Sequence, residues 1–134
     1  MNSVFADAFY FFALINRADV AHHKAKAYGR TAQARLVTTS WVLTELADGL
    51  AASQSRQKFV ELLQQLRTSD DVEVLPFSAA RFEAGIDLYA RRTDKNWSLT
   101  DCISFVVMRE RGLTDALTGD RHFEQAGFNV LLKG

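Results

Sequence analysis

The chain has little cysteine and little proline, one residue of each, and no net charge. The lone cysteine, Cys102, excludes an intrachain disulfide and favours a reducing compartment, so we expect the protein in the cytoplasm. Equal numbers of acidic and basic side chains give no overall signal for a polyanionic partner. The longest nearly apolar run, residues 4–15, is interrupted by Asp7 and is too short to cross a membrane, so we expect no membrane association.

The composition that remains is that of a folded protein. Of the 134 residues, 48% are hydrophobic and ten are phenylalanine, enough to bury a real core. Neither a repeat nor a linker divides the chain, and the only proline, Pro76, ends an apolar run. We therefore expect one domain, residues 1–134.

Apolar runs with strand character alternate with segments of helical periodicity. The expected strands are 3–6, 35–38, 72–75, 116–118 and 129–132, and the expected helices are 8–16, 20–30, 41–50, 55–66, 79–91, 101–111 and 121–125. This alternation predicts a three-layer α/β/α domain with a central, mostly parallel sheet.

Helix starts and buried faces also follow from local patterns. We expect N-caps from Ser40, Ser55 and Ser78, with Thr100 opening the helix 101–111. That helix is apolar almost all round, which predicts that it is the central buried helix. The helix after Ser78 is expected to bury a stripe formed by Ala79, Phe82, Ile86 and Tyr89.

Four acidic residues lie where a regular element meets apolar sequence: Asp7, Glu45, Asp101 and Asp120. A carboxylate in such a place is costly to desolvate unless it is paired, hydrogen-bonded or bound to a cation. In parallel α/β sheets, sites form outside the carboxyl ends of the strands, where Asp7 and Asp120 fall. A converging cluster of hard oxygen ligands suits Mg²⁺ or Mn²⁺.

Each acid also has a purely structural interpretation. Asp7 is a candidate helix N-cap, Asp101 a partner of the helix dipole, Asp120 a turn residue and Glu45 a salt-bridge partner. The joint occurrence of all four at one end of one sheet favours the metal site. Helical spacing places Glu45 at the edge of the apolar stripe of its helix and Asp48 towards solvent, so we expect Asp48 to be dispensable.

Several segments carry a family resemblance: residues 4–7 (VFAD), Thr44-Glu45, residues 98–102 (SLTDC) and residues 117–123 (LTGDRHF). They resemble the PIN-domain ribonucleases, above all the VapC-type toxins of bacterial toxin–antitoxin pairs and their stand-alone relatives. The resemblance implies that the four acids form a Mg²⁺- or Mn²⁺-dependent active site that hydrolyses RNA, and that a cognate antitoxin binds the protein. It also matches Thr118 to a hydroxyl residue that supports the last acid. One departure is that Ala8 and Phe9 follow Asp7, where the family often has a Ser, Thr or Asn. We also expect a homodimer.

Other polar residues near these motifs keep two interpretations each. His122 is expected either to approach the substrate or to serve in packing or capping, and Arg121 either to contact phosphate or to form a surface salt bridge. Trp97 is expected to pack the preceding loop, and Cys102 to fill the core.

The sequence also bears on three other functions. An aspartyl phosphatase needs a second Asp two residues after Asp7, where the chain has Phe9. A phospho-receiver module needs an acceptor Asp after the strand 72–75, which Pro76 and Phe77 do not provide. A PIN-like domain that binds RNA or protein without cleaving it remains the alternative.

Overall fold

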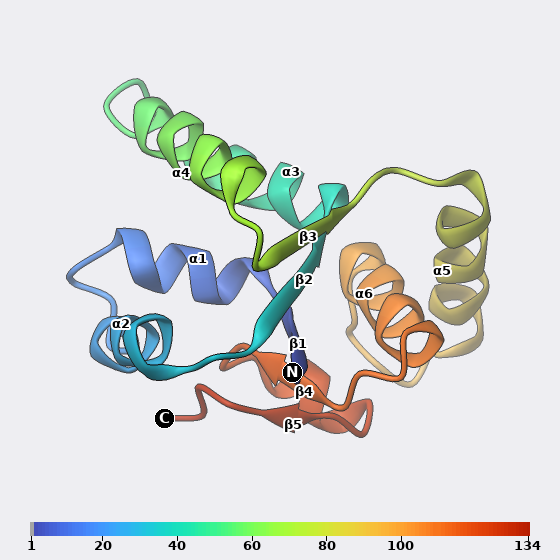
Figure 1. The fold of residues 1–134 in the computed structure, drawn as a ribbon. Helices are drawn as coiled ribbons and strands as arrows, with labels where there is room; N and C mark the ends of the chain where they lie inside the picture. Colours follow the sequence, from blue (N-terminus) through green and yellow to red (C-terminus); the bar gives the residue numbers. More distant parts are fainter. Residues whose placement is uncertain (1) are drawn as a thin grey trace.

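The computed structural model describes residues 2–134, which form a five-stranded parallel sheet with helices on both faces (Figure 1). The strands are β1 (Ser3–Ala6), β2 (Arg35–Thr39), β3 (Val72–Leu75), β4 (Asp115–Leu117) and β5 (Asn129–Val130). The helices are α1 (Ala8–Ile15), α2 (His22–Thr31), α3 (Ser40–Gly49), α4 (Arg56–Thr68), α5 (Ala79–Arg91), α6 (Leu99–Glu110) and α7 (Arg121–Gln125). Every expected element is present, and the predicted three-layer α/β/α class is confirmed.

The strand order is β3-β2-β1-β4-β5, and all four neighbouring pairs are parallel. From β1 the chain first builds the sheet towards β3, and it later returns to the other side of β1 to add β4 and β5. The order therefore reverses between β1 and β4. Open α/β sheets bind ligands in the crevice at such a reversal, outside the carboxyl ends of the strands.

The helices form layers of unequal depth. In Figure 1, α1 and α2 lie on one side of the sheet and α6 on the other, with α5 outside α6. The burial of α6 confirms the prediction of a central helix, because Cys102, Ile103, Phe105, Val107 and Met108 are all buried. No helix among residues 2–134 combines the length and the apolar character that a membrane span needs.

The predicted start of α6 is wrong by two residues. Thr100 does not open the helix, because Ser98 is its N-cap. The Ser98 hydroxyl accepts the backbone N–H of Asp101 at 3.0 Å, and the Asp101 carboxylate accepts the backbone N–H of Ser98 at 3.1 Å. This reciprocal capping box satisfies two amides that would otherwise lack partners, which is why the helix begins at Leu99.

Two of the other three predicted caps also need correction. The N-cap of α3 is Thr39, whose hydroxyl accepts the backbone N–H of Val42, and not Ser40. Ser55 precedes α4 but makes no capping hydrogen bond through its side chain. Ser78 caps α5 as predicted, accepting the N–H of Arg81 at 3.3 Å.

The predicted core stripe of α5 is wrong, because Phe82 is 39% exposed and Tyr89 is 54% exposed. The buried residues of α5 are Gly85 and Leu88. A Cβ atom at Gly85 would lie 2.4 Å from Cγ1 of Ile103, so the glycine lets α5 approach α6 closely. The pattern of apolar side chains along a helix cannot predict that its buried face is centred on a glycine, because glycine has no side chain.

Trp97 is buried, as predicted, and its indole ring packs edge-on against Phe105. Its Nε1–H donates to Oε1 of Gln125 at 3.0 Å. This bond ties the loop before α6 to the end of α7. The two helices that carry Asp101 and Asp120 at their starts are therefore fixed relative to each other.

Candidate metal centre and active site

Asp7 immediately follows β1 and is buried. It is the N-cap residue of α1 by position, as the structural interpretation has it, but its side chain makes no capping hydrogen bond. Oδ2 of Asp7 instead accepts the hydroxyl hydrogen of Thr118 at 2.9 Å. The Thr118 oxygen in turn accepts the backbone N–H of Asp120 at 3.1 Å. One hydroxyl group, just past β4, thus links the first acid to the last.

The hydrogen bond from Thr118 takes the place of one from a hydroxyl or amide side chain directly after Asp7, where this chain has Ala8 and Phe9. The donor is Thr118, which lies directly after β4, and not a residue of α1. Phe9 has a packing role instead. A Cβ atom at Gly119 would lie 2.5 Å from Cζ of Phe9, so the Phe9 ring packs directly over the backbone between Thr118 and Asp120.

Asp101 and Asp120 each begin a helix and use one carboxylate oxygen to do so. Oδ2 of Asp101 belongs to the capping box with Ser98, and Oδ1 of Asp120 accepts the backbone N–H of His122 at 2.9 Å. Asp101 lies in the first turn of α6, as its structural interpretation has it, whereas Asp120 is the N-cap of α7 and not a turn residue. These hydrogen bonds leave Oδ1 of Asp101 and Oδ2 of Asp120 without a hydrogen bond from any residue in 2–134.

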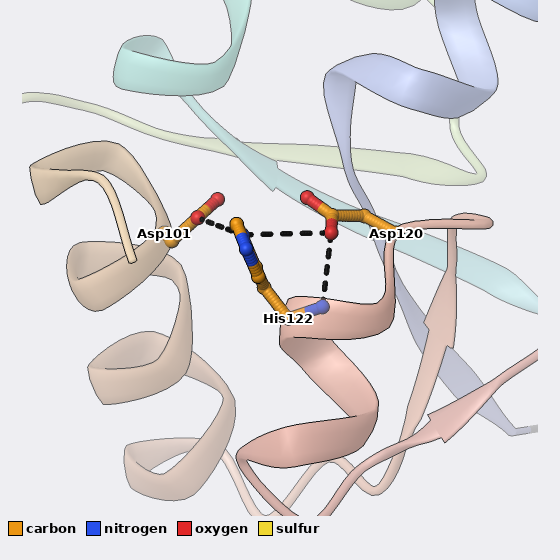
Figure 2. Close-up of side chains that lie close together, drawn as sticks. All are labelled: Asp101, Asp120 and His122. Atoms are coloured by element: carbon orange, nitrogen blue, oxygen red, sulfur yellow. Dashed lines mark hydrogen bonds and ion pairs between the residues drawn. The ribbon is translucent and has the colours of Figure 1, made fainter. Parts of the chain in front are cut away.

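His122 lies between these two carboxylates (Figure 2). Its Nδ1 is 3.1 Å from Oδ2 of Asp101 and 3.5 Å from Oδ1 of Asp120. The three residues offer ligand atoms that all lie within 4.8 Å of one another, close enough to share a metal ion. The sequence placed His122 near the site but left its role open. The signal it carried is its position two residues after a helix N-cap, which turns its side chain back towards that cap.

Glu45 reaches the same cluster from α3 and is half-buried. Burial raises the pKa of Glu45, and the negative charges of Asp101 and Asp120 raise it further. Burial likewise raises the pKa of Asp101, and the charge of Asp120 adds to the effect. Asp7 and Glu45 therefore lie near this pair, but among residues 2–134 the ligand atoms that fall within 4.8 Å of one another are those of Asp101, Asp120 and His122.

Asp48 is exposed, as expected, but it is not remote from Glu45. Both line a shallow cavity of about 330 Å³ together with Trp41, Phe77 and Thr100. Three residues apart on one helix, the two acids are neighbours on its surface. Glu45 and Asp48 therefore differ in burial, as predicted, but their side chains lie on neighbouring parts of the helix surface.

Arg121 is exposed at the start of α7 and forms no ion pair within the described part of the chain. The salt-bridge interpretation of Arg121 therefore has no support. Cys102 is buried, and burial raises the pKa of its thiol, so it is a core residue and not a nucleophile.

The donor set fits a divalent cation. Crowded carboxylates in a partly buried site repel one another, and burial raises the pKa of Asp7 to about 7 despite the hydrogen bond from Thr118. A cation that takes oxygen ligands relieves both effects. The unengaged oxygens of Asp101 and Asp120 point to the same side, away from α7, where one ion can reach both (Figure 2).

Comparisons with known proteins agree with this geometry. Residues 4–129 match the PIN domain family. The chain is 28% identical over 125 residues to the 23S rRNA-specific endonuclease VapC20 of Mycobacterium tuberculosis, which covers 93% of this chain and 95% of the relative.

Solved structures give the same result. The crystal structure of VapC20, described as a Sarcin-Ricin loop cleaving toxin, superposes with a TM-score of 0.85 over 93% of this chain and 95% of that one. FitAcB from Neisseria gonorrhoeae (TM-score 0.65, 20% identity, 95% of each chain) and DNA-bound VapBC from Salmonella typhimurium (0.67, 16%, 97% of each) share the fold. The resemblance that the sequence motifs carried is thereby confirmed: this chain belongs to the PIN-domain family.

Proposed function

We propose that the protein is a metal-dependent endoribonuclease that hydrolyses RNA phosphodiester bonds, with Mg²⁺ or Mn²⁺ held by Asp7, Glu45, Asp101 and Asp120. The observation that supports the proposal is the cluster of Asp101, Asp120 and His122, to which Asp7 is joined through the hydroxyl of Thr118. A single PIN domain spanning residues 1–134 accounts for this function.

Each residue of the proposed active site has a separate role. When bound, a divalent cation polarises the phosphate and lowers the pKa of an attacking water. Asp101 and Asp120 offer their unengaged oxygens to the cation, and Thr118 holds Asp7 in place. Glu45 lies at the border between the buried cluster and the cavity, and its raised pKa suits a group that accepts a proton from water. Exposed Arg121 is available for a phosphate of the RNA backbone.

RNA is the proposed substrate because the relative that matches almost the whole chain is named as a 23S rRNA endonuclease. VapC20, which this chain resembles over 93% of its length, is described as a toxin, so we propose a cognate antitoxin as the partner of this chain. With RNA as the proposed substrate, we also propose that the protein acts in the cytoplasm.

We also propose a homodimer that forms through aromatic side chains near the start of α5. Phe77 is 63% exposed and Phe82 is 39% exposed, and both line a hollow with Trp41, whose ring lies 5.2 Å from that of Phe77. A two-fold interface pairs the same patch of both subunits, so this exposed apolar patch would pack against its copy in the dimer. Light scattering on a sizing column should give a dimer mass for the wild type and a monomer mass for Phe77→Ser/Phe82→Ser.

The central test is RNA cleavage with Mg²⁺, with Mn²⁺ and with EDTA. Cleavage is expected with either cation and not with EDTA. Glu45→Gln should abolish most of the activity, whereas the matched change Asp48→Asn, one turn along the same helix, should leave it intact. RNA binding without cleavage under all three conditions would instead favour the PIN-like binding domain.

A further inference from the structure

The imidazole of His122 lies where it touches both Asp101 and Asp120 (Figure 2). We infer that His122 is a positioning residue, whose Nδ1 orients these two carboxylates towards the cation. The inference rests on the proposed metal-dependent function and assigns a specific task to a residue whose role the sequence leaves open.

The hydrogen-bond partners of Nδ1 decide which tautomer is present. Both neighbours of Nδ1 are carboxylate oxygens, which accept hydrogen bonds when ionised and do not donate them. A carboxylate that holds a cation is ionised, so Nδ1 carries the hydrogen in the metal-bound protein. A ring nitrogen that carries hydrogen has no in-plane lone pair left for a metal ion, so Nδ1 is a donor to the acids and not a ligand.

His122 donates to these acids twice. Its backbone N–H binds Oδ1 of Asp120 at 2.9 Å, and its Nδ1–H binds Oδ2 of Asp101 at 3.1 Å. Together with the backbone N–H of Ser98, these donors occupy one oxygen of each carboxylate. The rotation of each carboxylate is thereby fixed.

The second oxygen of each carboxylate is left for the ion. Oδ1 of Asp101 and Oδ2 of Asp120 accept no hydrogen bond within residues 2–134, and Figure 2 shows both on the side away from α7. Carboxylates that are already oriented lose less conformational freedom when a cation binds, and hydrogen bonds from outside the ligand set commonly strengthen metal binding tenfold or more.

Binding of Mn²⁺ to the metal-free full chain, measured by calorimetry, tests this role with two substitutions. His122→Asn keeps an N–H donor near the position of Nδ1, whereas His122→Leu removes it. We expect His122→Leu to weaken Mn²⁺ binding by about tenfold or more and His122→Asn to stay within about threefold of wild type. His23→Leu, at an exposed histidine on α2, is the control and should bind as wild type does. Metal-free thermal melts verify that each variant is folded.

Pulsed electron paramagnetic resonance on the Mn²⁺-loaded protein supplies an independent readout. No strong ¹⁴N coupling from a coordinated imidazole is expected in the wild type. Such a coupling, if it disappears in His122→Asn, would overturn the inference and make His122 a ligand. Equal weakening by Asn and Leu, no weakening by Leu, or a wild type that binds no Mn²⁺ would overturn it too. RNA cleavage by the wild type, with Mn²⁺ and with EDTA, decides the proposed function separately.

Discussion

The hydroxyl of Thr118 donates a hydrogen bond to Oδ2 of Asp7 at 2.9 Å, although 111 positions separate the two residues in the chain. Thr118 is fully buried, and its oxygen also accepts the backbone N–H of Asp120 at 3.1 Å. One side chain therefore sets the orientation of the carboxylate after β1 and the path of the loop after β4. Both acids depend on it for their placement.

The change Thr118→Val keeps the shape of this side chain and removes its hydroxyl. It leaves a buried carboxylate oxygen and a backbone N–H without their partner, which should lower the free energy of unfolding by about 1–3 kcal/mol. Urea denaturation in EDTA measures the loss. Thr31→Val removes an exposed hydroxyl that bonds only to the Ala27 carbonyl, and it should change stability far less. Equal effects from the two changes would contradict the role of Thr118.

The sequence predicted the elements of this fold well because their signals are local. Apolar runs and helical periodicity gave every strand and helix within two residues of its observed ends. The strand at 129–132 illustrates the remaining difference. Its regular part ends at Val130, but the N–H groups of Leu131 and Leu132 still donate to Ala116 and Thr118, so the segment follows β4 beyond the strand.

Features that depend on contacts across the fold were harder to predict. The alternation of elements does not show that α5 lies outside α6, so Phe82 and Tyr89 were wrongly expected in the core. The positions of Asp7 and Asp120 at strand ends did indicate one crevice. Nothing along the chain showed that the ring of His122 would lie between Asp101 and Asp120, since that depends on how α6 and α7 pack.

Gly119 and Phe9 provide a test of packing next to the site. A Cβ atom at position 119 would lie 2.5 Å from Cζ of Phe9, so Gly119→Ala must displace the ring or the loop that carries Asp120. We expect Gly119→Ala to destabilise the protein by about 1–3 kcal/mol, as other overpacked sites do.

The double variant Phe9→Leu/Gly119→Ala should recover part of this loss, because the smaller side chain leaves room for the new methyl group. A double-mutant cycle from thermal melts measures the coupling between the two positions. Additive effects would show that the ring is not what excludes a side chain at position 119.

The metal-free protein should lose stability as the pH rises from about 4 to about 7. Burial raises the pKa of Asp7 to about 7; the bond from Thr118 opposes this shift, and Glu45 and Asp101 add to it. In the unfolded chain the same group titrates near about 3.9. Between these values the folded state holds a proton that the unfolded state has released, so the free energy of unfolding falls as pH rises.

Asp7→Asn removes this proton, and the difference between wild type and variant isolates it from other titrating groups. The wild type should lose up to about 1.4 kcal/mol per pH unit relative to the variant across this range. Denaturation at several pH values in EDTA gives both curves. Parallel curves would mean that Asp7 is ionised in the folded protein throughout.

Asp101 acts both in the capping box of α6 and, by our proposal, in metal binding, and two substitutions separate these roles. Asp101→Asn keeps an oxygen that accepts the N–H of Ser98 and removes one negative charge from the cluster, so its metal-free form should melt no lower than wild type. Asp101→Ala also loses the cap and should be less stable than Asp101→Asn by about 1 kcal/mol.

Added MnCl₂ then separates the two roles of Asp101. At a hundredfold excess over Kd, a cation that binds only the folded state stabilises it by about 2.7 kcal/mol. The Tm of the wild type should therefore rise when MnCl₂ is added. The Tm of both variants should rise much less, and both variants should lose RNA cleavage. If Asp101→Asn kept both the Mn²⁺-dependent rise in Tm and the cleavage, while Asp101→Ala lost only stability, Asp101 would be a helix cap and not a ligand. Thermal melts with EDTA and with MnCl₂, run beside the cleavage assay, distinguish these outcomes. A helix cap stabilises the folded protein in both conditions, whereas a metal ligand stabilises it only with MnCl₂.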